Sequence, residues 1–482
     1  MIIALSLILV VVIIASLPLW LPPLVVRLRI WVFTRVNGED GVPVPGEAVD
    51  VSQFRKVYGS PAASGRSKGA ALSDLFWYWL SPGPEMHQEH LENGPRYEAV
   101  AQATRQILAV SRKEAEADAT WSAARILNEL GMDKSRLARL RDLMMPIWAD
   151  FYYGLVFEEE CTPEIRELIV GNANDVVSAL KMTKLRNMKK RYRLTRFLVR
   201  KLESGRLPQV LPEGFTTLER AYFLQGVFFN TAIVQMSEAM AHLLLFVAEN
   251  PAVQAKLMQN LEDNRYLDQV IAESLRVNPL FGIAHRITTD EIIGSHGRKL
   301  PKGSVLCFNY QQFHHAGYDH PQEFRPERWG ELSQHDENYM PFGMIGNRPC
   351  PAQAVALVTM RAAARETLRR FSIFSSVAHT RSIPNRGPCW LEPQGRSTQS
   401  SWRKTALYFM RVRDGWEDVG RSILQLFLGV FMVWDARRLR LCQKYFESIG
   451  STMPDVKSEP AAKCPLHRLV RPLRSHHEHA GI

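Results

Sequence analysis

The sequence predicts a largely helical protein with one N-terminal membrane anchor, and three observations support this fold class. Residues 2–26 carry no charge and consist mainly of Ile, Leu and Val, and such a run is long enough to cross a hydrocarbon core of roughly 30 Å. A second apolar stretch, residues 219–247, ends at Asn250-Pro251, where a helix is expected to stop. Residues 353–371 are rich in Ala and periodic, which predicts another helix.

The N-terminal run also predicts on which side of the membrane the rest of the chain lies. Three arginines between residues 27 and 35 follow it, and the positive-inside rule then places the next domain on the cytoplasmic side. A cleaved signal peptide is the alternative, but the run lacks a basic start and a small-residue cleavage site. We therefore expect a transmembrane anchor over residues 1–26. A hinge and linker rich in Gly, Pro and Ser should occupy residues 27–70.

The most informative segment is Pro341-Phe-Gly-Met-Ile-Gly-Asn-Arg-Pro-Cys-Pro-Ala352. It places the thiol of Cys350 among small and turn-forming residues. Gly343 and Gly346 allow the backbone to turn tightly around the sulfur. Free amides and the N-terminus of the following helix would stabilise a thiolate. Cys350 is thus a candidate metal ligand, with a buried structural cysteine as the alternative.

This loop resembles the haem-binding loop of the cytochrome P450 family, whose pattern is Phe-x-x-Gly-x-Arg-x-Cys-x-Gly. Gly346, Arg348 and Cys350 match the pattern in register. Phe342 lies one residue too far upstream, and Ala352 replaces the closing glycine. The resemblance implies that Cys350 is the axial thiolate ligand of the iron in haem b.

Two further segments extend the resemblance. Glu273 and Arg276 match the Glu-x-x-Arg motif of the family, and residues 321–329 are close to its Pro-x-x-Phe-x-Pro-Glu-Arg-Trp segment. The family pattern implies that Arg328 joins Glu273 and Arg276 in a buried network, because buried charges require mutual pairing. The implied fold is mostly α with a small β region, the cytochrome P450 fold, over residues 71–400.

The resemblance also suggests which residues bind the haem propionates. Arg286, on a strand pair that is expected to line the haem pocket, and Arg348 are candidates, because guanidinium groups bind carboxylates in a fork. An exposed strand arginine is the alternative for Arg286. Trp121 and Arg125 fit the family's Trp-x-x-x-Arg, whose side chains contact a propionate. A plain amphipathic helix explains that short pattern equally well.

The oxygen-activation helix of the family is expected at residues 219–247. The motif with an acid before a threonine reads Val227-Phe-Phe-Asn-Thr231 here, so that Thr231 is retained and Asn230 replaces the acid. An amide does not titrate near neutral pH and is unable to relay a proton as a carboxylate does. A polar pair packed within a helix is the alternative. The apolar pocket wall is expected from Phe228, Phe229, Leu280, Phe281 and Ile283.

The implied function is a monooxygenase that inserts one oxygen atom from O2 into an apolar small organic substrate. Electrons would come from NADPH through a separate reductase, because the chain contains no Gly-rich flavin or nicotinamide segment. The sequence resembles fungal microsomal members, which implies the endoplasmic reticulum membrane and a tailoring step in secondary-metabolite biosynthesis. Two alternatives remain: a haem-thiolate isomerase, dehydratase or peroxygenase, and a non-catalytic haem-binding scaffold.

Composition excludes other classes of protein. Six cysteines are scattered without a paired spacing, which argues against a disulfide framework and against zinc. The formal charge is +11, but no nucleic-acid motif accompanies it. Residues 401–450 predict a helical extension, of which the apolar part 423–434 is too short to span a bilayer and is expected on the membrane or on the catalytic domain. Residues 451–482 are expected to be a disordered basic tail.

Overall fold

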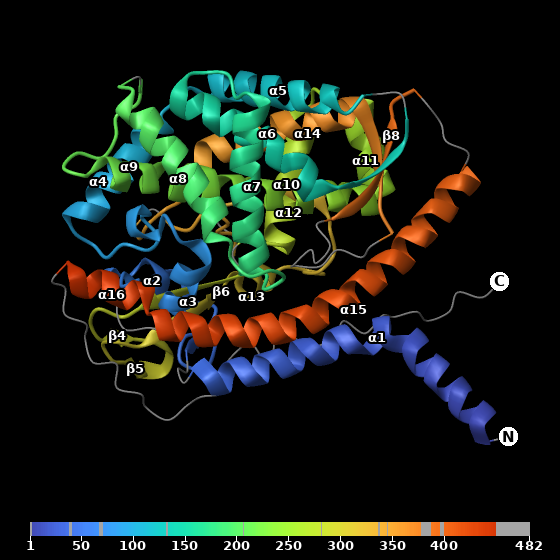
Figure 1. The fold of residues 1–482 in the computed structure, drawn as a ribbon, viewed down its shortest axis with the longest axis horizontal. Coiled ribbons are helices and arrows are strands. Elements are labelled where there is room, and N and C mark those ends of the chain that lie inside the picture. The colour runs from blue at the N-terminus through green and yellow to red at the C-terminus, as the bar shows by residue number, and fades with distance from the viewer. Residues whose placement is uncertain are drawn as a thin grey trace.

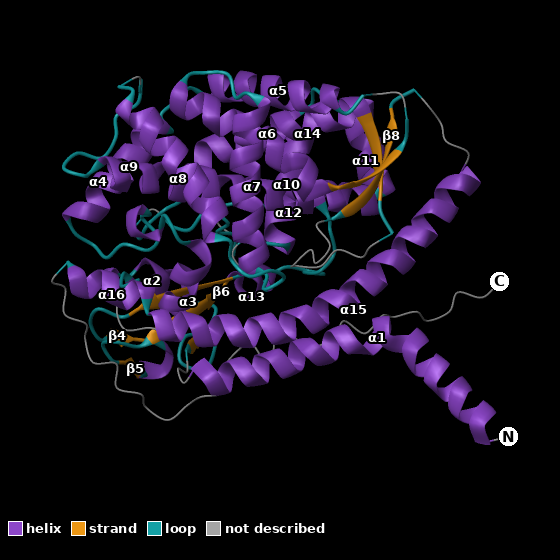
Figure 2. Ribbon diagram, viewed as in Figure 1, coloured by secondary structure: helices purple, strands orange, loops and turns teal. Residues whose placement is uncertain are grey.

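The structure is a computed structural model in which helices predominate (Figures 1 and 2). It describes residues 2–37, 41–66, 71–131, 134–205, 207–280, 282–335, 338–344, 346–376, 387–395 and 400–449. The expected tail at residues 451–482 and the expected pocket residue Phe281 therefore lie outside the described residues.

The first helix is longer than the predicted anchor. α1 spans Ile2–Asn37 and contains Pro18, Pro22 and Pro23, and Figure 1 shows a bend in it. Proline removes a helix hydrogen bond and clashes with the preceding turn, so bends of this kind are expected where prolines lie inside a helix. The three prolines thus lie within one continuous helix.

The predicted linker is partly folded into the domain, which corrects the expected boundary at residue 70. Strand β1, Val42–Val44, pairs in parallel with β6, Val305–Asn309. β6 pairs on its other side with antiparallel β3, Ile283–Ile287. Helix α2, Phe54–Gly59, follows and packs Phe54 and Tyr58 on Phe308 of this sheet, with ring centroids 5.3 and 5.0 Å apart.

The body of the domain is a helical layer whose long members pack on one another. Its helices are α3 Ala71–Leu80, α4 Pro95–Ile107, α5 Arg112–Glu129, α6 Leu140–Phe157, α7 Pro163–Leu180, α8 Met188–Glu203, α9 Thr217–Leu224, α10 Ile233–Glu249, α11 Pro251–Gln259, α12 Asn264–Val277, α13 Tyr310–His315 and α14 Gln353–Arg370. α5 packs on α14, and α6 packs on α10. Apolar side chains of these four helices form the largest buried cluster.

Two further small sheets complete the β region, so the predicted fold class is confirmed. One has the strand order β2-β8-β7, formed by Arg136–Arg139, Pro388–Pro393 and Phe371–Phe374. The other pairs β4, Ile292–Ile293, with β5, Lys299–Leu300.

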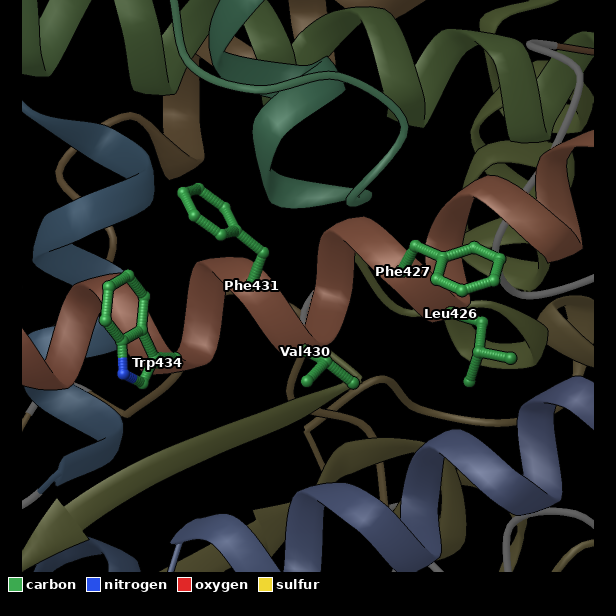
Figure 3. Close-up of a pocket in the computed structure, with 5 residues that line it drawn as sticks. All are labelled: Leu426, Phe427, Val430, Phe431 and Trp434. Atoms are coloured by element: carbon green, nitrogen blue, oxygen red, sulfur yellow. The ribbon is translucent and has the colours of Figure 1, made fainter.

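Within the part of the chain that the structure describes, three helical stretches are long and apolar enough to cross a membrane. The most apolar 18-residue window of Leu5–Leu28 in α1 contains no buried residue, whereas 72% of the corresponding window of Thr217–Glu249 is buried, and this stretch belongs to the core. The third, Trp402–Ser448, comprises α15, Ser400–Leu439, and α16, Leu441–Ser448. α15 runs beside α1 along one side of the molecule (Figure 1). Its apolar surface groove is shown in Figure 3.

Candidate cofactor-binding site

The Cys350 loop is fastened to the segment that follows β1. The Nδ2 atom of Asn347 lies within hydrogen-bond distance of the backbone carbonyls of Tyr58, Ser60 and Ala63, at 2.8, 3.2 and 3.2 Å. Gly343 has a φ of +74°, and a Cβ there would lie 3.1 Å from the Tyr58 hydroxyl. Glycine is therefore needed at this turn.

The Cys350 thiol is half-buried at the start of α14. Its own amide donates to the Phe342 carbonyl at 2.9 Å. Burial raises the pKa of the free thiol, while a hydrogen bond from the backbone of Ala352 acts in the opposite direction. A metal cation bound to the sulfur would lower the pKa of the thiol and so oppose the effect of burial, because ligation removes the thiol proton. The loop thus presents one sulfur with one amide beside it.

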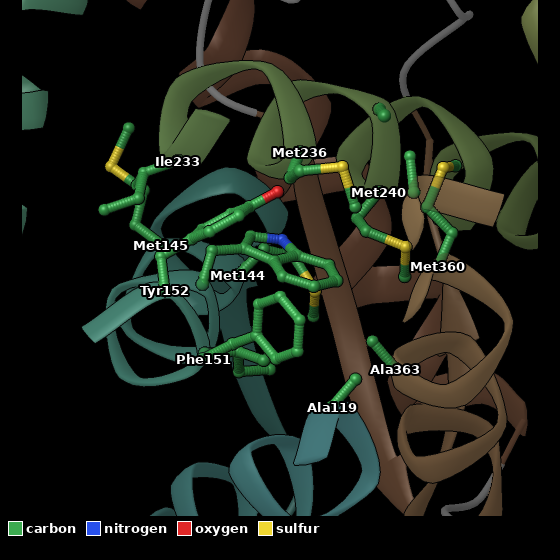
Figure 4. Close-up of a cluster of buried hydrophobic side chains, with 14 of the residues drawn as sticks. Ala119, Met144, Met145, Phe151, Tyr152, Ile233, Met236, Met240, Met360 and Ala363 are labelled. Carbon is green, nitrogen blue, oxygen red and sulfur yellow. The ribbon is translucent and has the colours of Figure 1, made fainter. Parts of the chain in front are cut away.

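Apolar side chains from α6 and α10 pack close to this loop. Tyr152 of α6 is buried, and burial together with the neighbouring Cys350 raises the pKa of its phenol. Figure 4 shows Tyr152 among Met144, Met236 and Met360, which come from α6, α10 and α14. The thiol therefore borders the main apolar core.

Three guanidinium groups gather beside the loop. Arg66, Arg286 and Arg348 are 6%, 0% and 6% exposed. Burial lowers the pKa of both Arg66 and Arg348, and it is the largest cause of the shift. The nearby charge of Arg286 lowers both pKa values further, since like charges disfavour ionisation.

Arg348 and Arg66 have several acceptors, and each leaves only its buried Nε atom without a hydrogen-bond partner among the described residues. Arg348 donates from Nη1 to the carbonyls of Gln88 and Leu91, at 2.6 and 2.7 Å, and from Nη2 to Oδ1 of Asn93 at 2.7 Å. Arg66 donates to the His285 carbonyl at 2.6 Å and forms an ion pair with Glu89.

Arg286 is different. It donates from Nη2 to the Asn347 carbonyl at 3.3 Å, and its guanidinium lies 4.1 Å from the centre of the Tyr58 ring. Its Nε and Nη1 atoms are buried and have no hydrogen-bond partner among the described residues. A buried charge with unpaired donors is costly unless an anion completes it.

The neighbouring histidines do not supply that anion, and they add no positive charge at neutral pH. Burial lowers the pKa of His87 to about 4 and that of His285 to about 3, and nearby Arg66 acts in the same direction. The pKa of His90 is also lowered, first by burial. The cluster therefore carries excess positive charge from its arginines and suits a ligand with carboxylates.

These donors fit haem b. The group needs one axial ligand for its iron and cationic partners for two propionates. A half-buried thiol and a buried arginine with two unpaired N–H groups, fixed by the same loop, supply both kinds of partner.

The structure brings Glu273, Arg276 and Arg328 together as the sequence predicted. Glu273 accepts from Nε and Nη2 of Arg276, both at 2.8 Å, and from Nε of Arg328 at 3.0 Å. The indole of Trp329 and the amide of Arg325 also donate to it, each at 3.0 Å. The side chains of Glu273 and Arg276 are 0% exposed. All of these contacts pair the buried charges.

On the other long helix, residues 225–232 form a π-helical segment, η3 (Gln225–Ala232), between α9 and α10. Such segments are rare and often lie at functional sites. Asn230 is buried in it, and its Oδ1 accepts from Nδ2 of Asn172 at 2.5 Å. Its Nδ2 lies 3.3 Å from the Pro82 carbonyl and 3.5 Å from that of Leu80. The amide is thus held by α7 and by the loop after α3.

Both ends of the Asn230 amide are thus engaged by protein groups, and its expected place in oxygen activation stays a prediction. Thr231, the next residue of the expected motif, is half-buried. These hydrogen bonds agree with the alternative of a polar pair packed within a helix.

The expected pocket residues are only partly brought to one place. Phe228 and Phe229 are 1% and 0% exposed, and Phe229 stacks on Phe157 with ring centroids 6.2 Å apart. They belong to the apolar core between η3 and α6, and their assignment to a pocket wall stays a prediction. Leu280 and Ile283 are half-buried, just before and at the start of β3.

Trp121 and Arg125 are not brought to the guanidinium cluster. Trp121 is 53% exposed, and Arg125 forms ion pairs with Asp150 and Glu160, the latter at 3.0 Å. The two side chains stack on each other, 4.9 Å from cation to ring centre. Their assignment as propionate ligands is therefore corrected to a surface cation–π pair.

Sequence reasoning missed Arg66, Tyr58 and Asn347. Arg66 and Tyr58 lie in the segment that the sequence predicts as a linker, where no motif marks them. Asn347 stands inside the cysteine loop, and its position next to Arg348 is the available clue. What these residues share is long-range packing, with the side chain of Asn347 bonded 284 to 289 positions away in the chain.

This chain is similar in sequence and in fold to known cytochrome P450 proteins. The family model for Cytochrome P450 matches residues 164–394. Cytochrome P450 3A13 of Mus musculus is 30% identical over 157 residues, which cover 28% of this chain and 31% of the relative. Cytochrome P450 3A29 of Sus scrofa is 30% identical over 169 residues, which cover 31% and 33%. The chain thus matches about a third of the length of these curated relatives.

Solved structures agree over a longer part of the chain. A zebra fish cytochrome P450 solved with abiraterone superimposes with a TM-score of 0.57 at 19% identity, over 71% of this chain and 90% of that one. A cyanobacterial P450, CYP120A1, with retinoic acid bound gives 0.57 at 15% identity, over 70% and 87%. At such identities the likeness shows the fold.

Proposed function

Because the chain belongs to the cytochrome P450 family, we propose that it is a haem-thiolate monooxygenase that inserts one oxygen atom from O2 into an apolar small organic substrate. The observation that carries the proposal is the contact between the Cys350 loop and Arg286 of β3. Arg286 donates from Nη2 to the Asn347 carbonyl of that loop, while its buried Nε and Nη1 have no hydrogen-bond partner among the described residues. A thiol alone or a buried arginine alone can serve a purely structural role. Together they match the two kinds of partner that haem b requires.

The roles of the residues follow from their contacts. Cys350 would ligate the iron, and the Ala352 amide beside the sulfur would tune its electron donation. Arg286 would donate to a propionate through Nε and Nη1, and Arg66 and Arg348 would hold the site cationic around it. When bound, haem supplies the redox chemistry that activates O2, and thiolate donation favours O–O cleavage.

The groups that move protons remain part of the proposal. Asn230 is engaged elsewhere, so Thr231 is the candidate from the expected motif, with ordered water completing the path. The isomerase, dehydratase or peroxygenase alternative keeps its ground, because the acid of the motif is still replaced by an amide that relays no proton. A non-catalytic haem-binding scaffold has no structural observation in its favour.

Partners and location complete the proposal. Electrons would come from NADPH through a separate reductase, and membrane lipid would hold α1. The exposed apolar helix Leu5–Leu28 suits an anchor in the endoplasmic reticulum, with the domain on the cytoplasmic side. A tailoring step in fungal secondary metabolism is a narrower proposal that rests on the sequence resemblance.

The first test is the carbon monoxide difference spectrum of the reduced protein. The full chain should give the red-shifted Soret band of a thiolate-ligated haem, and Cys350→Ala should abolish it. Arg286→Met should weaken haem retention, while Arg265→Met, an exposed arginine on α12, should not. A wild-type spectrum without the thiolate band contradicts the proposal.

The second test separates the reaction classes. Turnover of a substrate that induces a spin shift should require both NADPH and a reductase. Turnover without them would favour the isomerase, dehydratase or peroxygenase alternative. Haem binding with no spin-shifting ligand and no turnover would favour the scaffold.

A further inference from the structure

An apolar stripe on α15 faces away from the domain. Its exposed members are Phe409, Trp416, Ile423, Phe427, Val430 and Trp434. They are between 40% and 69% exposed and follow one another at intervals of seven, seven, four, three and four residues. Such spacing places them on one face of a helix. Part of the stripe lines the surface groove in Figure 3, with Leu426 and Phe431.

The opposite face of α15 contains polar groups that bond to the domain. Glu417 pairs with Arg139 at 2.9 Å, and Nε2 of Gln425 donates to the Lys181 carbonyl at 2.8 Å. Asp414 is 3% exposed. α15 also buries a few apolar side chains, among them Met410, Val419 and, on α3, Met432. A surface helix in water has the reverse arrangement, with its apolar face inward. The outward stripe therefore requires an apolar environment.

α1 connects this stripe to the membrane anchor. A Cβ on Gly415 would lie 3.4 Å from Cβ of Pro18, so α1 and α15 are in close contact at the bend of α1. Val25, two helical turns further on, is 4% exposed beside α15. The residues of α1 before the bend extend away from the domain (Figure 1). A bilayer entered by the first part of α1 is therefore adjacent to α15.

We propose that α15 is a membrane-surface helix whose apolar stripe lies at the boundary between headgroups and acyl chains of the bilayer that α1 enters. α15 does not cross that bilayer, because the uncharged run between Arg421 and Asp435 has 13 residues. At roughly 1.5 Å per residue this covers about 20 Å, less than the roughly 30 Å of a hydrocarbon core.

The chemistry at the ends of the stripe fits a lipid surface rather than a second protein. Trp416 and Trp434 carry an apolar ring with a polar N–H, and such residues are enriched at membrane interfaces. Arg413 on one side and Arg438 on the other, which are 41% and 58% exposed and pair with Asp414 and Asp435, would meet anionic headgroups. α1 and α15 together would then fix the orientation of the domain on the bilayer, which one flexible anchor does not do.

The test uses the full chain in nanodiscs of phosphatidylcholine and phosphatidylserine. The photoreactive residue p-benzoylphenylalanine replaces Phe427 in one variant and Ile293, which is 50% exposed on β4, in the control. Illumination should give lipid adducts at position 427 and none at 293. Cross-links from 427 to a second copy of the chain, without lipid adducts, would overturn the proposal, as would the absence of any adduct.

A second variant guards against a local effect of the photoreactive group. With the label at Trp416, the double change Phe427→Glu and Val430→Glu should lower the lipid-adduct yield at least about tenfold, because two apolar side chains leave the bilayer. The nanodiscs should still retain the protein through α1, and the haem spectrum should be unchanged. An unchanged adduct yield would show that the stripe does not hold α15 at the lipid surface.

Discussion

At the scale of single residues, Asn230 shows how an interpretation changes with its contacts. The sequence places it before Thr231, where the family carries an acid, and so suggests altered proton delivery. In the structure its amide joins η3 to Asn172 and to the Pro82 carbonyl. Its function is then to hold three segments of chain together around a π-helical turn.

We expect Asn230→Asp to destabilise the protein without increasing turnover. A carboxylate can accept the Asn172 hydrogen bond but has no proton to donate to the Pro82 and Leu80 carbonyls. The cost should be about 2–4 kcal/mol in the free energy of unfolding. Asn260→Asp, the same change at an exposed site, should cost less than about 0.5 kcal/mol. Gain of turnover with stability kept would restore the proton-relay interpretation.

His314 is expected to make the stability of the folded protein depend on pH. It is 0% exposed, and its Nε2 accepts from the Met340 amide at 3.0 Å, just before the cysteine loop. This bond requires the neutral imidazole, and burial lowers the pKa of His314 to about 3. In the unfolded chain the pKa of this histidine is about 6.5, so it binds a proton at a pH where the folded protein keeps it neutral.

Stability should therefore fall as the pH drops from about 6.5 toward 3, by about 1.4 kcal/mol per unit from this group. In His314→Gln the amide oxygen can accept the Met340 N–H but does not titrate. Urea unfolding at pH 7 and pH 5 should show a loss about 2 kcal/mol smaller in the variant than in the wild type. Equal losses in both proteins would assign the acid sensitivity to other groups.

At the scale of elements, the π-helical segment depends on a close backbone contact. A Cβ on Gly226 would lie 2.6 Å from the carbonyl oxygen of Gly83, in the loop after α3. Gly83 itself has a φ of +129°. The helix and the loop thus approach each other more closely than any side chain allows. This contact places the Pro82 carbonyl near Asn230.

Gly226→Ala should destabilise the protein by about 2 kcal/mol or more, because a backbone atom must move to admit the methyl group. Gly420→Ala is the matched control, since a Cβ at this α15 position meets no atom within 4 Å. That change should stabilise by about 0.5–1 kcal/mol, as expected for alanine in a helix. Thermal unfolding of both variants in the same membrane mimetic should show a lower melting temperature for Gly226→Ala and a higher one for Gly420→Ala. Shifts of the same sign in both variants would contradict the close contact between Gly226 and Gly83.

Motif residues could be predicted from the sequence where the chemistry fixes residue types at a fixed spacing. The pair Glu273 and Arg276 is of this kind, since both residues lie on one helix and bond to each other. Cys350 stays a predicted ligand on the same ground of fixed motif spacing. Arg66 could not be predicted, because packing brings it from a distant segment to His285. The orientation of Asn230 depends on a π-helical turn that no local pattern marks.

At the scale of the whole molecule, the C-terminal extension supports the candidate site through α3. Trp77 of α3 packs on Tyr445 and Phe446 of α16, with ring centroids 5.0 and 5.9 Å apart. Ser73 and Phe76, on the same helix, contact the ring of His285 next to Arg286. A change in α16 can therefore reach the guanidinium cluster through one rigid helix.

Asp74 is the residue that fixes α16 to α3. Its Oδ1 accepts from the amides of Cys442 and Gln443, at 2.9 and 3.2 Å, and so caps a helix whose own N-cap residue, Arg440, makes no side-chain cap. Asp74→Ala removes this cap and should cost about 1–2 kcal/mol, whereas Asp74→Asn keeps an acceptor and should cost a few tenths of a kcal/mol.

The decisive measurement is the rate at which haem leaves the protein for an excess of apomyoglobin, with limited proteolysis of α16 followed in parallel. In Asp74→Ala both rates should rise, because a loosened α16 frees α3 and with it the neighbours of His285 and Arg286. In Asp74→Asn both should stay near the wild-type values. Faster proteolysis with unchanged haem release would mean that the extension is an appendage and that α3 holds the site without it.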